Sequence, residues 1–143
     1  MLVSQILKGK GDLVFTASPS DTVGAVAALL HARRVGAMVV VEADRDVAGI
    51  VSERDIVRIV AEEGADGLRK PISSCMTRDV IFADPGETVD ALLSRMTDRR
   101  VRHLPVCVGG RLVGIVSIGD LVKVKIEETT AEAEGLKAYI SAG

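Results

Sequence analysis

The sequence predicts an α+β fold built from two copies of one β-α-β-β-α unit, with small sheets packed against helices. The first observation is an internal repeat: Gly49–Arg58 and Gly114–Lys123 share Gly-Ile-Val-Ser, an Asp three residues after the Ser, and a Val two residues after that Asp. The match continues upstream at a constant shift and pairs Pro19 with Pro85, Thr22 with Thr88, Val23 with Val89, Ala25 with Ala91, and Arg33-Arg34-Val35 with Arg99-Arg100-Val101. The second observation is that short β-branched runs alternate with segments of helical periodicity in both copies. A self-match this long indicates one structural unit used twice.

The first repeat is expected to span residues 1–67. Its helices follow from apolar residues at helical spacing, and its strands follow from β-branched runs bounded by polar turns. The expected elements are a short strand at Leu13–Thr16, a helix capped by Ser20 or Asp21 that ends near Arg33-Arg34, a buried strand at Ala37–Val41, a turn at Asp44-Arg45-Asp46, a return strand at Val47–Val51, and a helix from Ser52 to Val60.

The second repeat is expected to span residues 68–126 on the same plan. Gly109-Gly110 is a strong signal for a tight hairpin between its two longer strands. The expected elements are a strand at Val80–Phe82, a break at Asp84–Glu87, a helix with Val89, Leu92, Leu93 and Met96 on its apolar face, strands at Leu104–Val108 and Leu112–Val116, and a helix from Ser117 through Val122.

Three further segments connect or flank the repeats. Glu63–Gly67 is polar and contains glycine, which predicts a loop. Leu2–Leu7 and Pro71–Met76 resemble each other, and we expect each to lead into its own repeat. Residues 127–143 form a C-terminal tail, in which three apolar residues at helical spacing (Leu136, Tyr139 and Ile140) predict a helix that seeks a partner surface. The alternative is a frayed, solvated end.

Composition narrows the function. The chain has 143 residues, 48% of them hydrophobic, and a net charge of only −2, which gives no support to nucleic-acid or membrane binding through bulk charge. Phe15, Phe82 and Tyr139 are the aromatic residues, too few for base stacking on aromatic platforms. Cys75 and Cys107 have no disulfide or metal spacing; Cys107 is expected to be a buried small hydrophobe and Cys75 an inert linker residue. Met1–Leu7 lacks the pattern of a signal peptide, and the apolar run Ala37–Val41 is too short to span a bilayer, so we expect a cytoplasmic protein.

Each repeat carries Ser-x-x-Asp where a strand passes into a helix: Ser52 with Asp55, and Ser117 with Asp120. The first N–H groups of a helix are unpaired within it and, with the helix dipole, favour a phosphate. The Ser hydroxyl is suited to a phosphate oxygen, and the Asp, on the same helical face, to the two hydroxyls of a ribose. The alternative is an ordinary N-terminal capping box, with Asp in place of the usual Glu.

The tandem arrangement of Thr-Val-x-x-Ala helix, hydrophobic strand and Gly-hydrophobic-Val-Ser-x-x-Asp resembles a pair of CBS domains, also called a Bateman module. The most specific segments are Arg99–Val106 and Gly114–Lys123, and the resemblance covers about residues 1–126. It is closest in kind to stand-alone bacterial CBS-pair proteins, which have no catalytic domain attached. The resemblance implies two units related by a pseudo-twofold axis, adenine nucleotides bound in the clefts between repeats, and a homodimer.

The resemblance also suggests roles for individual residues. Arg54, Arg102 and His103 are expected to reach a ligand phosphate, whereas Arg33, Arg34, Arg99 and Arg100 suit solvated helix ends. Aliphatic side chains must hold the base, and the candidate nucleotide-binding residues are Phe15, Val35, Gly36, Ala37, Ser52, Arg54, Asp55, Ile81, Val101, Arg102, His103, Pro105, Ser117, Gly119 and Asp120. Gly119 stands where the first repeat has Arg54, Gly36-Ala37 where the second has Arg102-His103, and Val39 where the second has Pro105, so the two sites are not equivalent.

We therefore expect a non-catalytic sensor that binds an adenine nucleotide (AMP, ATP or NAD, with S-adenosylmethionine as a further candidate) and regulates an unknown protein. An enzyme is disfavoured, because His31 and His103 and the two cysteines form no nucleophile–base pair or metal set. There is no Gly-x-Gly-x-x-Gly after a strand, and Lys8–Gly11 lacks the spacing of a P-loop. The alternative function is a ligand-free protein–protein interaction module that regulates a partner.

Overall fold

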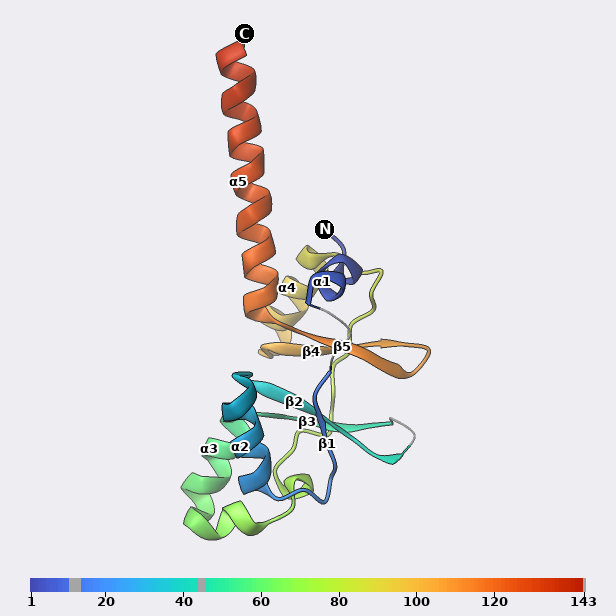
Figure 1. The fold of residues 1–143 in the computed structure, drawn as a ribbon, viewed down its shortest axis with the longest axis vertical. Coiled ribbons are helices and arrows are strands. Elements are labelled where there is room, and N and C mark those ends of the chain that lie inside the picture. Colours follow the sequence, from blue (N-terminus) through green and yellow to red (C-terminus); the bar gives the residue numbers. More distant parts are fainter. Residues whose placement is uncertain (11–13, 44–45, 143) are drawn as a thin grey trace.

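Two mixed helix–sheet units lie one above the other in the computed structural model, which describes residues 1–10, 14–43 and 46–142 (Figure 1). The lower unit in Figure 1 contains β1 (Thr16–Ala17), α2 (Val23–Arg33), β2 (Ala37–Val41), β3 (Val47–Ser52) and α3 (Glu53–Glu63). The upper unit contains α4 (Val89–Arg99), β4 (His103–Val108), β5 (Arg111–Ser117) and the first turns of α5 (Ile118–Ala142), together with α1 (Val3–Lys10) from the start of the chain. The predicted α+β class and the tandem units are confirmed.

The longer strands form two antiparallel hairpins. In the lower unit the sheet order is β1-β2-β3, with Val39 opposite Ile50, and in the upper unit β4 pairs with β5, with Pro105 opposite Ile115. These four strands lie within one residue of their predicted bounds. Gly109 and Gly110 both have positive φ, 57° and 79°, so the predicted glycine hairpin is confirmed. The turn expected at 44–46 falls largely outside the described residues.

Equivalent helices begin and end in the same way in the two units. Thr22 caps α2 and Thr88 caps α4, each through a side-chain oxygen that accepts a hydrogen bond from the backbone N–H three residues on. The cap expected at Ser20 or Asp21 was therefore wrong, because the Asp21 carboxylate accepts from the Ser18 N–H, 2.9 Å away, in the preceding turn. Arg34 and Arg100 close the two helices in the left-handed region, with φ of 55° and 56°.

The short first strand of each repeat differs from its prediction. In the first repeat it lies at Thr16–Ala17, paired parallel with Val39 and Val40, and Leu13 falls outside the described residues. In the second repeat no strand forms at 80–82. Ala83 makes an isolated bridge to Val106, while the Phe82 carbonyl accepts from the Arg95 side chain at 3.1 Å instead of from a neighbouring strand.

The N-terminal segment does not lead into its own repeat, as we had expected, but packs on the second one. Val3 and Ile6 are buried in the core that α4, β4, β5 and α5 share, which we call the second core. The backbone fixes this position, because the Val3 N–H donates to Glu87 O at 3.0 Å and the Ser4 N–H donates to Pro85 O at 2.9 Å. The expectation was wrong because a pattern of apolar residues shows that a face is buried but not which core buries it.

Residues 71–76, which precede the second repeat, pack in turn on the first repeat. Ile72, inside the 3₁₀ helix η3 (Ile72–Ser74), is fully buried in the first core with residues of α2, β2 and β3. Its N–H donates to Asp21 O at 2.7 Å, and the Val23 N–H donates to Lys70 O at 2.9 Å. Each core is thus completed by the segment that precedes the other repeat. The division of the chain at residue 67 stays a prediction about the sequence repeat.

The segment between the repeats is more ordered than the loop expected at Glu63–Gly67. α3 continues through Glu63, and a 3₁₀ helix, η2 (Gly64–Arg69), follows it. Gly67 is buried against Ile59, where a β-carbon would lie 3.1 Å from the Ile59 side chain. The cysteine expectation was also partly wrong: Cys75 is buried, whereas Cys107 is only half-buried, and both are free thiols.

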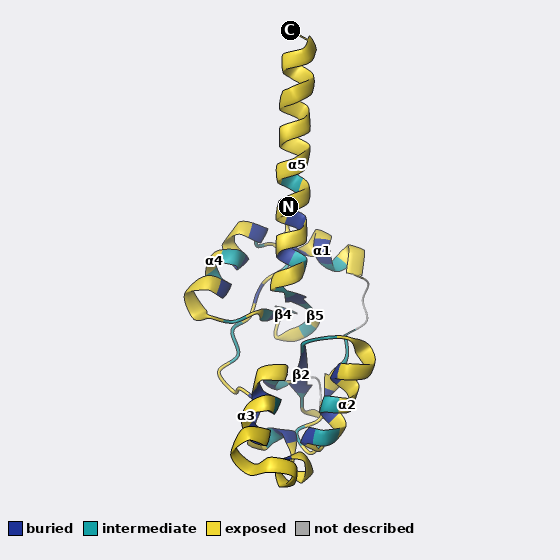
Figure 2. Ribbon diagram, turned by 90° about the vertical axis from the view of Figure 1, so that its left-hand side faces the viewer, coloured by how far each residue is buried: buried dark blue, intermediate teal, exposed yellow. Residues whose placement is uncertain are grey.

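α5 is a single helix of 25 residues, so the helix expected from Ser117 through Val122 and the helical tail expected at residues 127–143 are one continuous element. Its buried residues are Leu121 and Val124, which pack in the second core, and the remainder extends away from both units (Figures 1 and 2). Leu136, Tyr139 and Ile140 are exposed, so the expected partner of this helix stays a prediction. Within the described residues, no helix is both long and apolar enough to cross a bilayer.

Candidate functional site: a pocket between the repeats

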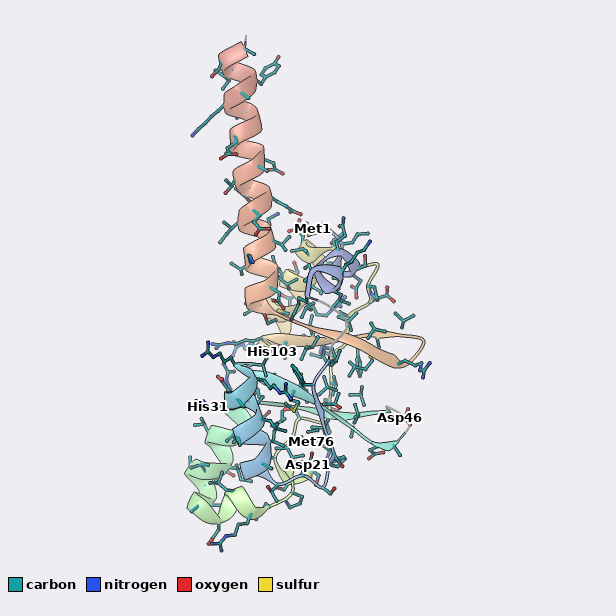
Figure 3. The ribbon with its side chains drawn as sticks, in the orientation of Figure 1. Met1, Asp21, His31, Asp46, Met76 and His103 are labelled. Atoms are coloured by element: carbon teal, nitrogen blue, oxygen red, sulfur yellow. The ribbon has the colours of Figure 1, made fainter. Side chains whose placement is uncertain are left out.

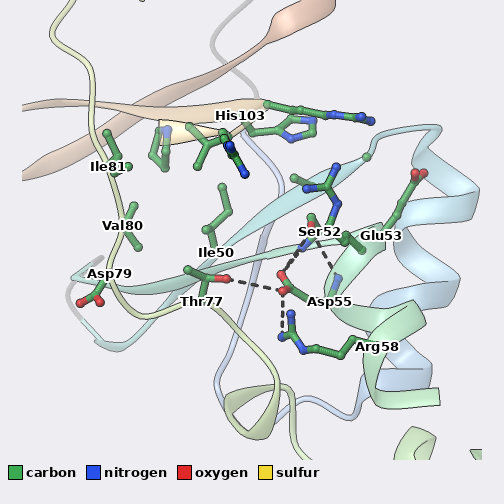
Figure 4. A pocket seen from close by; sticks show the side chains of 17 residues that line it. Ile50, Ser52, Glu53, Asp55, Arg58, Thr77, Asp79, Val80, Ile81 and His103 are labelled. Carbon is green, nitrogen blue, oxygen red and sulfur yellow. Dashed lines mark hydrogen bonds and ion pairs between the residues drawn. The ribbon is translucent and has the colours of Figure 1, made fainter. Parts of the chain in front are cut away.

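A pocket of about 300 Å³ lies between the two units, with walls from both repeats (Figure 4). The first repeat contributes the end of β3, the start of α3 and the residues before β2. The second contributes the extended segment 77–81 and the residues around the start of β4. The lining residues are Gly36, Ala37, Ile50, Ser52, Glu53, Arg54, Asp55, Arg58, Thr77, Asp79, Val80, Ile81, Arg100, Val101, Arg102, His103 and Pro105.

Asp55 organises the polar end of the pocket. Its carboxylate is buried and accepts hydrogen bonds from the Ser52 N–H at 2.9 Å, from the Arg58 guanidinium at 3.0 Å and from the Thr77 hydroxyl at 3.5 Å. Arg58 also donates to the carbonyl of Cys75 at 3.0 Å, so it links α3 to the residue that follows η3. The contact to Thr77 is the longest of the three and therefore the weakest.

The capping box that we considered as an alternative is present at Ser52. The Ser52 hydroxyl accepts from the Asp55 N–H at 3.4 Å, and the Asp55 carboxylate accepts from the Ser52 N–H. The Glu53 N–H donates to Gly36 O at 3.0 Å. Our expectation of unpaired N–H groups at this helix start was therefore wrong for Glu53 and Asp55, because a neighbouring carbonyl and the cap satisfy them.

Exposed arginine side chains are part of the pocket lining. Arg54, Arg100 and Arg102 are exposed and belong to both repeats, two of them next to the residues that start β4. Glu53 and Asp79 contribute negative charge, so the pocket carries both signs. A guanidinium offers a planar pair of donors, which suits phosphate oxygens.

Aliphatic side chains from both repeats also line the pocket. Ile50 on β3 faces Val80 and Ile81 of the second repeat across the pocket (Figure 4). Val101 and Pro105 of the second repeat also line it. Ile81 and Val101 are only partly buried against the second core, so part of each side chain is left for the pocket. Aliphatic side chains of this kind can pack against a flat, weakly polar ring in place of aromatic side chains.

His103 lies at the boundary between the two units (Figure 3). A methyl group on Gly36 would lie 3.4 Å from the imidazole Cε1 and Nε2, so the backbone of the first repeat passes close to this ring. Burial, the largest effect, holds the pKa of His103 below its ordinary value, and Lys10 and Arg102 act in the same direction. Asp120 and Glu53 oppose this shift. A neutral imidazole can both donate and accept a hydrogen bond.

The structure brings most of the predicted site residues together in this pocket. Those that line it are Gly36, Ala37, Ser52, Arg54, Asp55, Ile81, Val101, Arg102, His103 and Pro105. Those outside its lining are Phe15, Val35, Ser117, Gly119 and Asp120. Phe15 packs at the first core with the Arg33 guanidinium 4.1 Å from its ring centre, and Val35 lines a neighbouring hollow at the end of α2.

The second Ser-x-x-Asp motif has the same cap but a different cation. The Ser117 N–H donates to the Asp120 carboxylate at 2.8 Å, and the Asp120 N–H donates to the Ser117 hydroxyl at 3.1 Å. Lys10 of α1 donates to the same carboxylate at 2.7 Å and to Ile115 O at 3.1 Å. Burial acts to raise the pKa of Asp120, but the hydrogen bonds from Lys10 and Ser117 outweigh it and hold that pKa below its ordinary value. The two Ser-x-x-Asp motifs therefore differ in the cation that binds the carboxylate, and the non-equivalence of two ligand sites stays a prediction.

Sequence reasoning missed several lining residues, namely Ile50, Glu53, Arg58, Thr77, Asp79, Val80 and Arg100. Arg58 had a usable signal, because it follows Asp55 by three residues on a helix and so lies on the same face. Arg100 was assigned to a solvated helix end, and it is exposed, but it also lines the pocket. Segment 77–80 gave no signal, because its place depends on the pairing of Thr77 with Ile50 in the other repeat.

Comparison with known proteins gives one consistent result. The CBS domain family model matches residues 11–62 and 72–127. The solved CBS-domain-containing protein ATU1752 from Agrobacterium tumefaciens is 44% identical, with a TM-score of 0.85 over 87% of this chain and 99% of that chain. The CBS domain pair of protein MJ0100, solved in complex with 5′-methylthioadenosine and S-adenosyl-L-methionine, is 26% identical, with a TM-score of 0.80 over 90% of this chain and 98% of that chain. The mitochondrial CBS domain-containing protein CBSX3 of Arabidopsis thaliana is 32% identical over 99% of this chain and 72% of its own length.

Proposed function

This chain belongs to the CBS domain family, and from that premise we propose that it is a non-catalytic regulatory module that binds an adenine nucleotide of the AMP, ATP or NAD type between its two repeats. The observation that carries the proposal is the pocket itself. It combines a Ser-x-x-Asp motif, arginines from both repeats and an aliphatic wall in one space of about 300 Å³. That volume lies at the lower end of the range of about 300–1,000 Å³ for small-molecule sites, which favours a mononucleotide unit.

In this proposal the ribose binds at Asp55. The carboxylate has four lone-pair positions, and its long contact to Thr77 is the one that a ribose hydroxyl would most easily replace. Arg58 and the Ser52 N–H hold the carboxylate in place, so it does not have to reorganise when the ligand binds. The base lies against Ile50, Ile81 and Val101, with backbone groups supplying its hydrogen bonds.

The phosphate binds near Arg54, Arg100 and Arg102. These side chains are exposed, so they can approach a phosphate without the cost of burying a charge. Their positive charge favours an anionic ligand over S-adenosylmethionine, which carries a sulfonium. The adenosine derivatives bound to the related MJ0100 pair support the adenosine half of the proposal.

We propose no chemical step. The Ser52 hydroxyl is engaged in the helix cap, since it accepts from the Asp55 N–H and donates to the Asp55 carboxylate at 3.2 Å. Ligand binding is instead expected to change the relative populations of two arrangements of the repeats. A ligand that touches both repeats can favour one relative arrangement of them, by as much as its affinities for the two arrangements differ.

The regulated protein, the homodimer and a cytoplasmic location remain parts of the proposal. A ligand-induced change in the angle between the repeats would be transmitted to a second copy or to the regulated protein through the outer helices. Fractionation of the native cells and co-purification of the full chain test the location and the partner.

The test is thermal unfolding of the full chain with AMP, ATP, NAD, S-adenosylmethionine and adenosine, followed by calorimetric titration of the best ligand. Saturation at a hundred times Kd stabilises the folded state by about 2.7 kcal/mol, which a melting curve resolves. We expect Arg102→Ala to weaken binding of the anionic nucleotide roughly tenfold or more, because it removes a charged hydrogen bond, and to leave adenosine unaffected. Arg111→Ala, an exposed arginine on β5 outside the pocket, is the matched control. No shift with any of these ligands at millimolar concentration would favour the ligand-free interaction module.

A further inference from the structure

α5 carries an apolar seam that is left exposed by the residues that the structure describes. Its positions alternate at spacings of four and three residues, the pattern of a coiled-coil heptad. The seam consists of Val122, Ile126, Thr129, Ala133, Leu136 and Ile140, all of them exposed. At about 100° per residue, the seam is centred about 130° around the helix from Leu121 and Val124, the two residues that face the second core.

The length and exposure of this helix call for a partner. Ile126, Leu136 and Ile140 are exposed to 61%, 60% and 67%, and the helix continues past Val124 for several turns with its sides facing solvent (Figure 2). A helical segment of about 15 residues is marginal in water without packing. The C-terminal part of α5 therefore depends for its stability on a partner surface that packs against the seam.

We propose that the seam pairs with α5 of a second copy as a parallel two-stranded coiled coil. A single repeating seam is complementary to itself, so layers of identical residues meet across the axis. The small Ala133 and the polar Thr129 occupy the middle layers, and larger apolar residues occupy the ends.

The flanking charges select the parallel direction. In a parallel pair, Glu132 of one helix lies next to Lys137 of the second copy, an attractive contact that occurs twice by symmetry. An antiparallel pair that aligns the same seam brings Lys123 against Lys137 of the second copy and Glu132 against its own equivalent, which is repulsive at both places.

The rest of the chain leaves room for this arrangement. The seam points away from the second core, and Lys125 on its flank is bound to Asp90 of α4 at 3.0 Å, which fixes the helix on its own unit. The paired repeats of the two copies would then lie next to each other at the same end of the coiled coil. This pairing rests on the homodimer of the proposed function and adds the surface and direction by which the two copies meet. It needs no nucleotide and involves none of the pocket residues.

The deciding experiment is disulfide cross-linking of the full chain, in which the half-buried Cys107 is first changed to Ser. Ile140→Cys places a thiol in the seam, and the parallel pairing predicts an oxidised dimer on a non-reducing gel. Ala138→Cys, two residues away on the outer face of the same turn, is the matched control and should stay monomeric on the gel. Cross-linking of a mixture of Val122→Cys and Ile140→Cys chains, without self-linking of either, would show an antiparallel pair and overturn the proposal. Equal reaction of Ile140→Cys and Ala138→Cys, or no reaction of Ile140→Cys, would overturn it as well.

Circular dichroism gives an independent readout of the same contact. Leu136→Asp puts a charge in the seam and is expected to lower the helical signal at 222 nm and to weaken self-association at least tenfold in sedimentation equilibrium. Ala138→Asp adds the same charge outside the seam and should change neither. Equal helical signals for the two variants would show that the seam is not an interface. Nucleotide binding is expected to survive in both variants, so failure of this proposal can be told from failure of the proposed function.

Discussion

The Lys10 ammonium lies 2.7 Å from the Asp120 carboxylate, although 110 residues separate them in sequence. Asp55, the equivalent residue of the first repeat, receives its cation from Arg58, three residues away on its own helix. The Asp carboxylates of the two motifs are thus paired with different cations. That of Asp55 is paired within its own helix, and that of Asp120 is paired with α1 from the start of the chain. This difference makes the two motifs separable by mutation.

Lys10→Met is expected to destabilise the protein by about 1 kcal/mol at neutral pH, the usual size for a partly exposed ion pair. Because the pKa of Asp120 is lowered in the folded state, the contribution is complete above its ordinary pKa of 3.8 and is lost as the pH falls through the lower, folded-state pKa. Urea unfolding of both proteins across this acid range measures the difference, and Lys8→Met is the control. A difference that stays constant down to the lowest pH would contradict the assignment to Asp120.

Asp55→Ala should cost more, about 3 kcal/mol. The substitution removes the carboxylate half of the capping box, which accepts from the Ser52 N–H, and leaves the Arg58 guanidinium with only the Cys75 carbonyl among its described hydrogen bonds. Asp120→Ala is the matched variant, with an expected loss of about 1–2 kcal/mol, because the Asp120 side chain is 24% exposed and that of Asp55 only 7%, so water can replace more of what Asp120 supplies. Urea unfolding of the two variants measures which of them loses more free energy of unfolding. Equal losses would contradict the prediction that burial makes the Asp55 carboxylate more important for stability.

The paired glycines of the repeat should respond unequally to alanine. A β-carbon on Gly49 would lie 2.7 Å from the Thr77 carbonyl oxygen, which belongs to backbone that cannot move freely. A β-carbon on Gly114 would lie 2.5 Å from a terminal methyl of Leu7, which can rotate away. We expect Gly49→Ala to cost about 2 kcal/mol and Gly114→Ala less than about 1 kcal/mol, on the scale of overpacked cores. Thermal unfolding decides, and a larger loss for Gly114→Ala would contradict the prediction.

His103 should make the protein less stable in mild acid. Burial lowers its pKa below the ordinary 6.5, so the folded state binds a proton less readily than the unfolded chain does. Stability is therefore complete above pH 6.5 and falls as the pH drops from 6.5 towards the folded-state pKa. The imidazole signals in a proton NMR titration give this pKa directly, with His31→Gln to assign them. His103→Gln should flatten the stability profile in this range, and an unchanged profile would point to another group.

The sequence predicts the strands of both hairpins and the helices between them because these depend on local patterns. Ala37–Val41 is buried and β-branched, and Gly109-Gly110 requires a turn with positive φ. The exchange of the segments around Ile6 and Ile72 could not be predicted, because either core accepts the same apolar face. The continuity of α5 was also missed, although the apolar spacing of four and three residues from Val122 to Ile140 was a usable signal for one helix.

The part of the candidate site that lies in the repeated motifs could be predicted from the sequence. Ser52, Asp55 and the residues around His103 were found from their equivalents in the other copy or from the family resemblance. Thr77 and Asp79 reach the pocket through the path of the chain between the repeats, which no local pattern encodes. The satisfied N–H groups at the start of α3 depend on a carbonyl at Gly36, which likewise becomes visible only in the folded chain.

The exchange of the two leading segments has a consequence for how the protein is made. Val3 and Ile6 leave the ribosome before every other residue of the core that they complete, and Val124 leaves it last. The first core can close soon after Ile72 has emerged, whereas α1 must wait, unpaired, until almost the whole of both repeats has been synthesised. Neither repeat can therefore be cut out at its sequence boundary with an intact core, and synthesis must run nearly to its end before the second half gains its full set of contacts.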